Sequence, residues 1–228
     1  MRKLIVLVIA IILLFNFAIT SYANYERKVA AEGENYVNTQ SFASDIDAKS
    51  AILMEAKTGK ILYSKNETDK ASPASVTKIM TLIVVCKALE DGRINLTDNV
   101  TVSDNASSMG GSQVFLKEGE TMTVEELIKC TVIASANDAA TALAEHTSGS
   151  VDSFVAEMNK TAKELNLKNS NFENPTGLDD TTTNHYSSAE DIAIMSRKLI
   201  QYDIILKYSN VWQDTIRNGE FTLTNTNS

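Results

Sequence analysis

The sequence predicts a mixed fold of the α/β (α+β) class, with a cluster of helices and part of an antiparallel sheet. Two apolar runs, residues 50–56 and 61–64, flank a turn that contains Gly59, which is the pattern of a β-hairpin. Helical periodicity and helix-start signals follow from residue 75 to about residue 200. Residues 221–224 then resemble the beginning of a strand. Strand patterns near both ends and helical patterns between them are the basis of this prediction.

The N-terminus has the pattern of an export signal. A basic start at Arg2 and Lys3, an apolar stretch over residues 4–19 and small residues up to Ala23 predict a signal peptide over residues 1–23. An uncleaved membrane anchor is the alternative. Residues 24–46 are polar and without periodicity, so we interpret them as a linker, and we expect residues 47–228 to form the folded part.

The charge balance excludes some classes of partner. Removal of Arg2 and Lys3 with the signal would leave 19 basic residues against 29 acidic ones, a net charge of −10. No basic run interrupts this acidic composition, which argues against binding to nucleic acid or to anionic lipid. We expect an exported, extracytoplasmic protein that contacts membrane only through residues 1–23.

Two cysteines and two histidines are too few and too scattered for a metal site. Cys86 and Cys130 each lie in an apolar helical stretch, so buried free thiols are favoured over a disulfide, although export would permit one. Neither cysteine has metal-ligand spacing with His146 or His185. We expect no metal and no cofactor.

The first long helix is predicted over residues 75–89, where Asp91 and Gly92 follow as a C-terminal stop. Residues 97–120 are rich in loop signals. They contain two short β-like pieces, residues 100–102 and 113–116, and we expect this segment to lie beside a cleft.

Four more helices are expected after residue 120. The first opens at a capping box formed by Thr123 and Glu126, and the second runs from Asn137 to just before Gly149. The third is recognised by an apolar stripe at helical spacing: Val151, Phe154, Val155, Met158, Ala162 and Leu165.

The last helix is predicted to open at a capping box over residues 187–190 and to turn Ile192, Met195 and Leu199 inward. Between the third and fourth helices, residues 174–177 read as a turn.

Ser75 and Lys78 are the candidate nucleophile and base. Residues three apart share one face of a helix, so the Ser75 hydroxyl can meet the Lys78 amine. A serine needs a base to remove its proton, and a lysine serves only when neutral, which requires burial or positive potential to lower its pKa. The alternative is a helix-capping serine followed by a surface lysine.

A serine acyl-transfer site also needs polar groups from a second element, and Ser135 with Asn137 is the candidate pair. It lies in the short connection between two predicted helices, whereas the other Ser-x-Asn triplets, residues 64–66 and 103–105, lie in a strand end and in the loop-rich segment. The alternative for Asn137 is an ordinary helix cap.

Together these motifs resemble the low-molecular-weight penicillin-binding proteins, serine-type D-alanyl-D-alanine carboxypeptidases of peptidase family S11. The resemblance covers residues 45–228 and is carried by five ordered blocks: residues 73–81, 109–113, 134–140, 174–178 and 185–189. It implies a β-lactamase/DD-peptidase-like fold, incomplete in this chain.

The resemblance also implies a role for each candidate residue. Ser75 would attack the carbonyl between two terminal D-alanines of a peptidoglycan stem peptide while Lys78 takes its proton. Ser135 would relay a proton to the leaving amine, and Asn137 would orient the substrate amide and Lys78. β-Lactams would acylate Ser75 as mimics of the dipeptide.

One family motif is not found. No Lys-Thr-Gly follows Asn137, and the Lys-Thr-Gly at residues 57–59 precedes the nucleophile, so we assign it to the hairpin turn. We therefore expect a fragment that ends before the third motif and that is poorly folded or weakly active, because an oxyanion donor and the carboxylate-binding wall would be missing.

Three alternatives are open. A class A β-lactamase would need a glutamate four residues before an asparagine, but Ala162 stands four residues before Asn166. A Ser-His-Asp hydrolase would need Gly-x-Ser-x-Gly, which is not found; His185 is expected to fix a loop and His146 to lie near a helix end. An exported protein that binds muropeptide or β-lactam without turnover is the alternative from another class.

Overall fold

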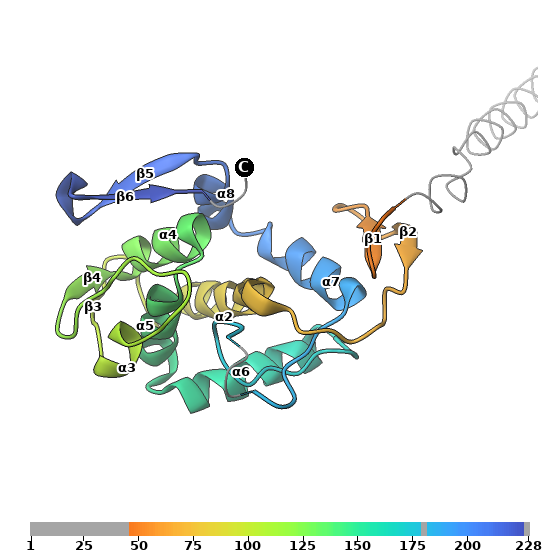
Figure 1. Ribbon diagram of the computed structural model, residues 1–228, viewed down its shortest axis with the longest axis horizontal. Helices are drawn as coiled ribbons and strands as arrows, with labels where there is room; N and C mark the ends of the chain where they lie inside the picture. Colours follow the sequence, from red (N-terminus) through yellow and green to blue (C-terminus); the bar gives the residue numbers. More distant parts are fainter. Residues whose placement is uncertain (1–45, 179–181, 226–228) are drawn as a thin grey trace, which may run out of the picture. The chain divides into compact units, whose positions relative to one another are not determined.

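The computed structural model describes residues 46–178 and 182–225, shown as a coloured ribbon in Figure 1. The expected signal peptide, residues 1–23, and all but the last residue of the expected linker lie outside the described residues. From Ala48 onward the chain forms one compact unit. Within the described part, no helix combines the length and the apolar character that a membrane crossing needs.

Helix α2 (Lys78–Glu90) is the central element of this unit. Nine of its thirteen residues are buried, so it is apolar on nearly all sides, as expected of a core helix. It contacts α5, α6 and α7, and Figure 1 shows it among them. The helices around it are α4 (Val124–Ala134), α5 (Asn137–Ser148), α6 (Val151–Glu164) and α7 (Ala189–Leu199), with the shorter α3 (Asp104–Ser107) and α8 (Asp203–Ser209).

The strands of the described part form three separate antiparallel pairs. The predicted hairpin is confirmed as β1 (Ala51–Met54) and β2 (Ile61–Lys65), and Gly59 has a φ of +77° in its turn. The other pairs are β3 (Asn99–Thr101) with β4 (Thr121–Thr123), and β5 (Gln213–Ile216) with β6 (Phe221–Thr224).

The β1–β2 hairpin packs against α7. Arg197 of that helix donates hydrogen bonds to the carbonyl oxygens of Ala56 and Lys57 at the hairpin turn. The Lys57 side chain is exposed, so the Lys-Thr-Gly of residues 57–59 serves the turn as predicted. Leu53 and Ile61 also remain exposed, at 55% and 40% of their surface.

Most predicted helix starts are confirmed. Thr123 and Glu126 form the reciprocal capping box at α4, and α5 and α6 have the predicted extents. The cap of α7 is shifted by one residue, because Ser188 accepts from the backbone N–H of Asp191 while the Ser187 hydroxyl bonds to Ser170. The box expected over residues 187–190 is therefore wrong in register.

Two further expectations are corrected. The helix predicted from Ser75 begins as a 3-10 turn, η1 (Ala74–Thr77), whose first residue, Ala74, has a positive φ of +45° that turns the chain sharply. Residues 113–116 form no strand, since the N–H groups of Val114 and Leu116 bind the Asp138 carboxylate instead of a neighbouring strand, and Phe115 has a φ of +58°. Helices α3 and α8 and strands β4 and β5 were not predicted.

Both cysteines are free and buried, as predicted. Burial raises the pKa of the Cys86 and Cys130 thiols to about 12. They act as small apolar side chains in the helical core.

Candidate active site

The turn that leads into α2 brings the first two candidate residues together. Ser75 lies in η1 and is exposed, whereas Lys78 is the first residue of α2 and is only 4% exposed. The distance from Lys78 Nζ to Ser75 Oγ is 3.1 Å. A hydroxyl accessible to a substrate is therefore paired with an amine withdrawn from solvent, and the alternative of a surface lysine is wrong.

The surroundings of Lys78 favour its neutral form. Burial lowers the pKa of Lys78 to about 8. Its second partner is the carbonyl oxygen of Thr176, 3.1 Å from Nζ, and no described carboxylate lies within ion-pair distance of it. A neutral amine can donate one N–H to Thr176 and accept the Ser75 proton on its lone pair.

The backbone of residues 174–178 forms hydrogen bonds to the first residues of α2. Thr81 of α2 donates to the carbonyl oxygen of Pro175 at 2.6 Å, next to the bond between Lys78 and Thr176. The Asn174 side chain accepts from the N–H groups of Thr176 and Gly177, as in an Asx turn. The predicted turn at residues 174–177 thus supplies two carbonyl acceptors to α2.

Gly177 allows the two segments to approach closely. A Cβ at this position would lie 1.8 Å from the carbonyl oxygen of Ala74, and the φ of Gly177 is +83°. Only glycine fits such an approach without moving the backbone. The strained turn at Ala74 and the turn at Gly177 therefore fit together.

His185 ties the same turn to a second loop, as the sequence predicted for its role. Its Nδ1 accepts from the N–H of Glu173, so Nε2 carries the proton and donates to Thr77 Oγ1 at 2.8 Å. Burial lowers the pKa of His185, which keeps this neutral form. His185 is a structural link between the loop and the start of α2.

Asn137 and Ser135 lie at the corner between α4 and α5, as predicted. Ser135 follows the end of α4 with a φ of +54°, and Ala136, not Asn137, precedes the first residue of α5. Asn137 Nδ2 donates to the carbonyl oxygen of Gly110 at 2.7 Å, and its Oδ1 is buried without a described partner. The helix-cap alternative for Asn137 is wrong, because its side chain reaches another segment instead of its own helix.

Asp138, which the sequence analysis did not single out as a site residue, fixes that segment. Its carboxylate is completely buried and accepts from the backbone N–H groups of Val114, Leu116 and Ala139 at 2.9–3.2 Å. Backbone donors of this kind stabilise a buried charge. Asp138 thereby holds residues 110–116 against α5, where the carbonyl oxygens of Gly110 and Ser112 reach Asn137.

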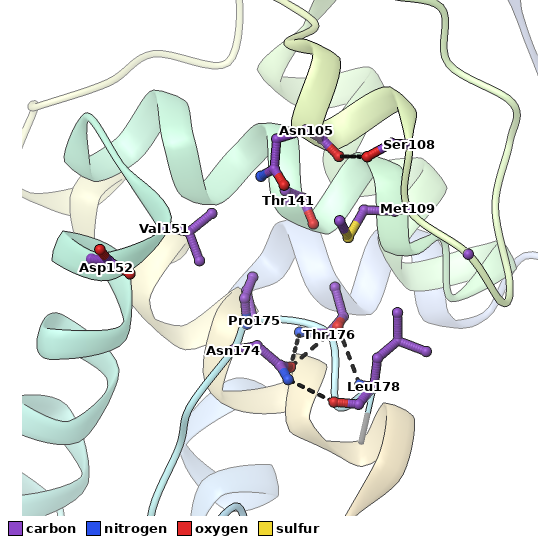
Figure 2. A pocket seen from close by; sticks show the side chains of 11 residues that line it. Asn105, Ser108, Met109, Thr141, Val151, Asp152, Asn174, Pro175, Thr176 and Leu178 are labelled. Atoms are coloured by element: carbon purple, nitrogen blue, oxygen red, sulfur yellow. Dashed lines mark hydrogen bonds between the residues drawn. The ribbon is translucent and has the colours of Figure 1, made fainter. Parts of the chain in front are cut away.

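A cavity of about 510 Å³ lies beside the hydrogen-bond partners of Lys78 and Asn137; it is drawn in Figure 2 and called here the side cavity. Gly110, whose carbonyl binds Asn137, and Thr176, whose carbonyl binds Lys78, both line it. Its other lining residues are Asn105, Ser108, Met109, Thr141, Val151, Asp152, Asn174, Pro175 and Leu178.

Three of the candidates thus have defined places. Ser75 contacts Lys78, and Lys78 and Asn137 each form a hydrogen bond to the carbonyl of a residue that lines the side cavity. The hydroxyl of Ser135 has no described hydrogen bond, so its relay role stays a prediction.

In the other two Ser-x-Asn triplets, residues 64–66 and 103–105, the described hydrogen bonds are structural. Ser103 and Asn105 both bond to Glu145, and Asn66 bonds to the carbonyl of Lys49. Glu164, from the β-lactamase alternative, pairs with Lys87 on the surface. In the described part of the chain, no three metal-binding side chains come together.

Comparison with known proteins adds to this geometry. Residues 36–228 match the model of peptidase family S11, D-alanyl-D-alanine carboxypeptidase. The chain is 45% identical over its whole length to the D-alanyl-D-alanine carboxypeptidase DacF of Bacillus subtilis, and 41% identical over 73% of its length to DacC of Escherichia coli. It spans 56% and 42% of the length of these two relatives.

Solved structures show the same fold. Penicillin-binding protein 6B from Escherichia coli matches with a TM-score of 0.75 at 37% identity, over 81% of this chain and 59% of that one. Penicillin-binding protein 5 from Haemophilus influenzae matches with a TM-score of 0.74 at 38% identity, over 79% of this chain and 53% of that one. The predicted DD-peptidase-like fold is confirmed for the described part.

Proposed function

The chain belongs to peptidase family S11, the D-alanyl-D-alanine carboxypeptidases, and from that premise we propose that it is a serine-type carboxypeptidase of peptidoglycan stem peptides. The substrate would end in D-Ala-D-Ala, and the reaction would pass through an acyl-enzyme on Ser75. The observation that carries the proposal is the contact of the exposed Ser75 with the buried Lys78, whose pKa is lowered to about 8.

In the first step, Ser75 Oγ attacks the carbonyl carbon between the two D-alanines while its proton passes to neutral Lys78. The oxyanion that forms lies against the backbone N–H of Ser75. The C–N bond then breaks, D-alanine leaves with a proton relayed through Ser135, and an ester remains on Ser75. Water attacks that ester and restores the enzyme.

Asn137 would hold the substrate during these steps. Its side chain is fixed through Nδ2 to Gly110, while the buried Oδ1 offers an acceptor to a substrate N–H or to Lys78. A polar atom that is buried and unpaired costs free energy, so a group that binds it is favoured. This supports a substrate-binding role for Asn137.

The proposed site of action is the cell envelope. Residues 1–23 would direct export, residues 24–46 would link the signal to the catalytic part, and the acidic folded part would work outside the cytoplasm. β-Lactams would act as covalent inhibitors at Ser75.

Mass spectrometry after incubation with benzylpenicillin tests the proposal. We expect a single penicilloyl adduct on the peptide that contains Ser75, none on the Ser75→Ala variant, and release of D-alanine from a peptide ending in D-Ala-D-Ala. Reversible penicillin binding without an adduct would overturn the enzyme proposal and favour a binding protein. Rapid hydrolysis of penicillin would instead indicate a β-lactamase.

A further inference from the structure

Resting on the proposed function, we propose that Arg217 is a positioning residue, which fixes the side chain of Asn137 through the loop of residues 110–120. Arg217 lies in a 3-10 turn, η2 (Arg217–Gly219), which follows β5 in the β5–β6 hairpin of Figure 1. Its guanidinium binds this loop, and Asn137 forms hydrogen bonds to carbonyl oxygens nearer the start of the same loop. The loop therefore connects the two side chains.

Arg217 binds the stretch of the loop that Asp138 also binds, but through different backbone groups. Nη1 of Arg217 donates to the carbonyl oxygen of Val114 at 3.0 Å, and Nη2 donates to that of Phe115 at 3.2 Å. The Asp138 carboxylate accepts from the N–H groups of Val114 and Leu116. A carboxylate thus holds this stretch by its N–H groups while a guanidinium holds it by its carbonyl groups.

The backbone at Phe115 needs such restraint. Phe115 has a φ of +58°, and its side chain is 63% exposed, with one ring contact to the edge of Phe221. A residue other than glycine in this conformation costs free energy and keeps it only where its surroundings hold the backbone. Loss of the guanidinium would free two carbonyl groups here, so the stretch could relax toward an extended conformation.

Glu120 fixes the direction of the Arg217 guanidinium. Arg217 Nε donates to Glu120 Oε1 at 2.6 Å and Nη2 donates to Oε2 at 3.1 Å, while the guanidinium lies over the ring of Phe221. These two side chains are only 21% and 19% exposed. A planar fork can bind a carboxylate with two N–H groups and keep others for carbonyl oxygens, whereas a lysine ammonium is a single point charge. The contacts therefore need arginine in particular.

The position of the loop determines the orientation of Asn137. The Ser112 carbonyl oxygen accepts from the backbone N–H of Asn137 at 2.7 Å, and the Gly110 carbonyl oxygen accepts from its Nδ2 at 2.7 Å. Space is tight between them, because a Cβ at Gly111 would lie 2.8 Å from Asn137 Nδ2. A shift of the loop would turn the Asn137 amide and with it the Oδ1 that is assigned to the substrate. Small displacements of such a group are costly to a reaction.

A double-mutant cycle on the full chain tests whether Arg217 acts through Asn137. Arg217→Met keeps the apolar stem and removes the guanidinium. We expect it to lower the second-order rate of Ser75 acylation by benzylpenicillin about tenfold, because Asn137 loses its orientation. In a chain that carries Asn137→Ala, the same substitution should lower the rate by less than about twofold, because no amide is left to orient.

Two further variants make the cycle specific. Arg217→Lys keeps the charge and the fold but not the fork, so we expect about a threefold loss of rate. Arg197→Met is the matched control, because Arg197 also donates to two backbone carbonyl oxygens, those of Ala56 and Lys57, in the hairpin turn of another part of the unit. It should leave the rate unchanged. Melting temperatures of all variants check that each is folded.

A spectroscopic measurement tests the positioning without any reaction. The side-chain amide signals of Asn137 in a ¹⁵N spectrum are assigned by their loss in Asn137→Ala. We expect Arg217→Met to shift these signals and to speed their exchange with water, because the bond to Gly110 weakens. Arg197→Met should leave them in place. This arm holds even if penicillin forms no adduct on Ser75 and the carboxypeptidase proposal fails.

Three results would overturn the positioning role. The first is an equal loss of acylation rate from Arg217→Met with and without Asn137, because Arg217 would then act by another route. The second is a full rate for Arg217→Lys, because charge alone would then suffice. The third is an unchanged Asn137 amide signal in Arg217→Met. A shifted signal supports the role, and a rate loss that depends on Asn137 supports it for the reaction itself.

Discussion

Two buried ionisable side chains of the candidate site region, Lys78 and Asp138, have different kinds of hydrogen-bond partner. The described hydrogen-bond partners of Lys78 Nζ are two oxygen atoms, the Ser75 hydroxyl and the Thr176 carbonyl, and burial lowers the pKa of Lys78 to about 8. Asp138, one residue after Asn137, is surrounded by backbone N–H groups and remains fully buried. The lysine is therefore set up to change its charge during a reaction, whereas the carboxylate is set up to hold a loop in place.

Lys78→Met would test the reactive half of this comparison. We expect the rate of Ser75 acylation by penicillin to fall about a thousandfold, because the base is lost while the buried chain keeps similar bulk. Stopped-flow or mass-spectrometric acylation rates measure it. Lys87→Met on the same helix, where the side chain is exposed and paired with Glu164, should leave the rate unchanged. Equal losses in both variants would contradict the assignment of Lys78.

Gly177→Ala would separate the turn at residues 174–177 from the turn before α2. The new Cβ would meet the Ala74 carbonyl at 1.8 Å, so the backbone must move, and we expect a loss of about 3 kcal/mol in unfolding free energy. Urea unfolding measures this loss.

Gly119→Ala is the control for that experiment. Its φ is +76°, but nothing lies within 4 Å of the added Cβ, so it should lose only about 1 kcal/mol. Similar losses for both variants would show that the close approach to Ala74 has no energetic weight.

Asp138→Ala would test whether the Asp138 carboxylate holds residues 110–116 in place. It leaves the N–H groups of Val114 and Leu116 buried without an acceptor, and we expect a loss of about 2–3 kcal/mol in unfolding free energy. Glu118→Ala, an exposed acid of the neighbouring loop, should change this free energy by less than about 0.5 kcal/mol. The prediction fails if the two variants unfold at the same urea concentration.

The pH dependence of acylation would give the smallest effect. Protonated Lys78 cannot accept the Ser75 proton, so the rate should fall as pH drops below the pKa of about 8 and level off above it. From pH 7 to pH 9 we expect about a tenfold rise, corrected for hydroxide hydrolysis of the penicillin. A flat profile over this range, with the circular dichroism unchanged, would rule out Lys78 as the base.

Local signals in the sequence were sufficient for much of the fold. The hairpin turn at Gly59 and the capping box of Thr123 and Glu126 depend on neighbouring residues only, and both were predicted. Residues 113–116 have an extended pattern but are bound by Asp138, which is more than twenty residues away. A pattern confined to a few residues cannot reveal that competing partner.

The same distinction applies to the site. The contact between Ser75 and Lys78 follows from helical spacing, and the corner that holds Asn137 follows from two adjacent helix signals. The carbonyl oxygens of Gly110 and Thr176 carry no mark in the sequence, because every residue has one and only the fold decides where it points. The acid next to Asn137 was visible, but it was interpreted only as part of a helix start.

The reaction rates of the two buried thiols can report how often the helical core opens transiently. Cys86 in α2 and Cys130 in α4 are 1% and 0% exposed, and with a pKa of about 12 they carry almost no thiolate at neutral pH. A maleimide dye should therefore label the protein only as fast as each helix is transiently released. Comparing the labelling rates of the two cysteines would show whether α2, which begins at Lys78, and α4, which ends before Asn137, open together or separately.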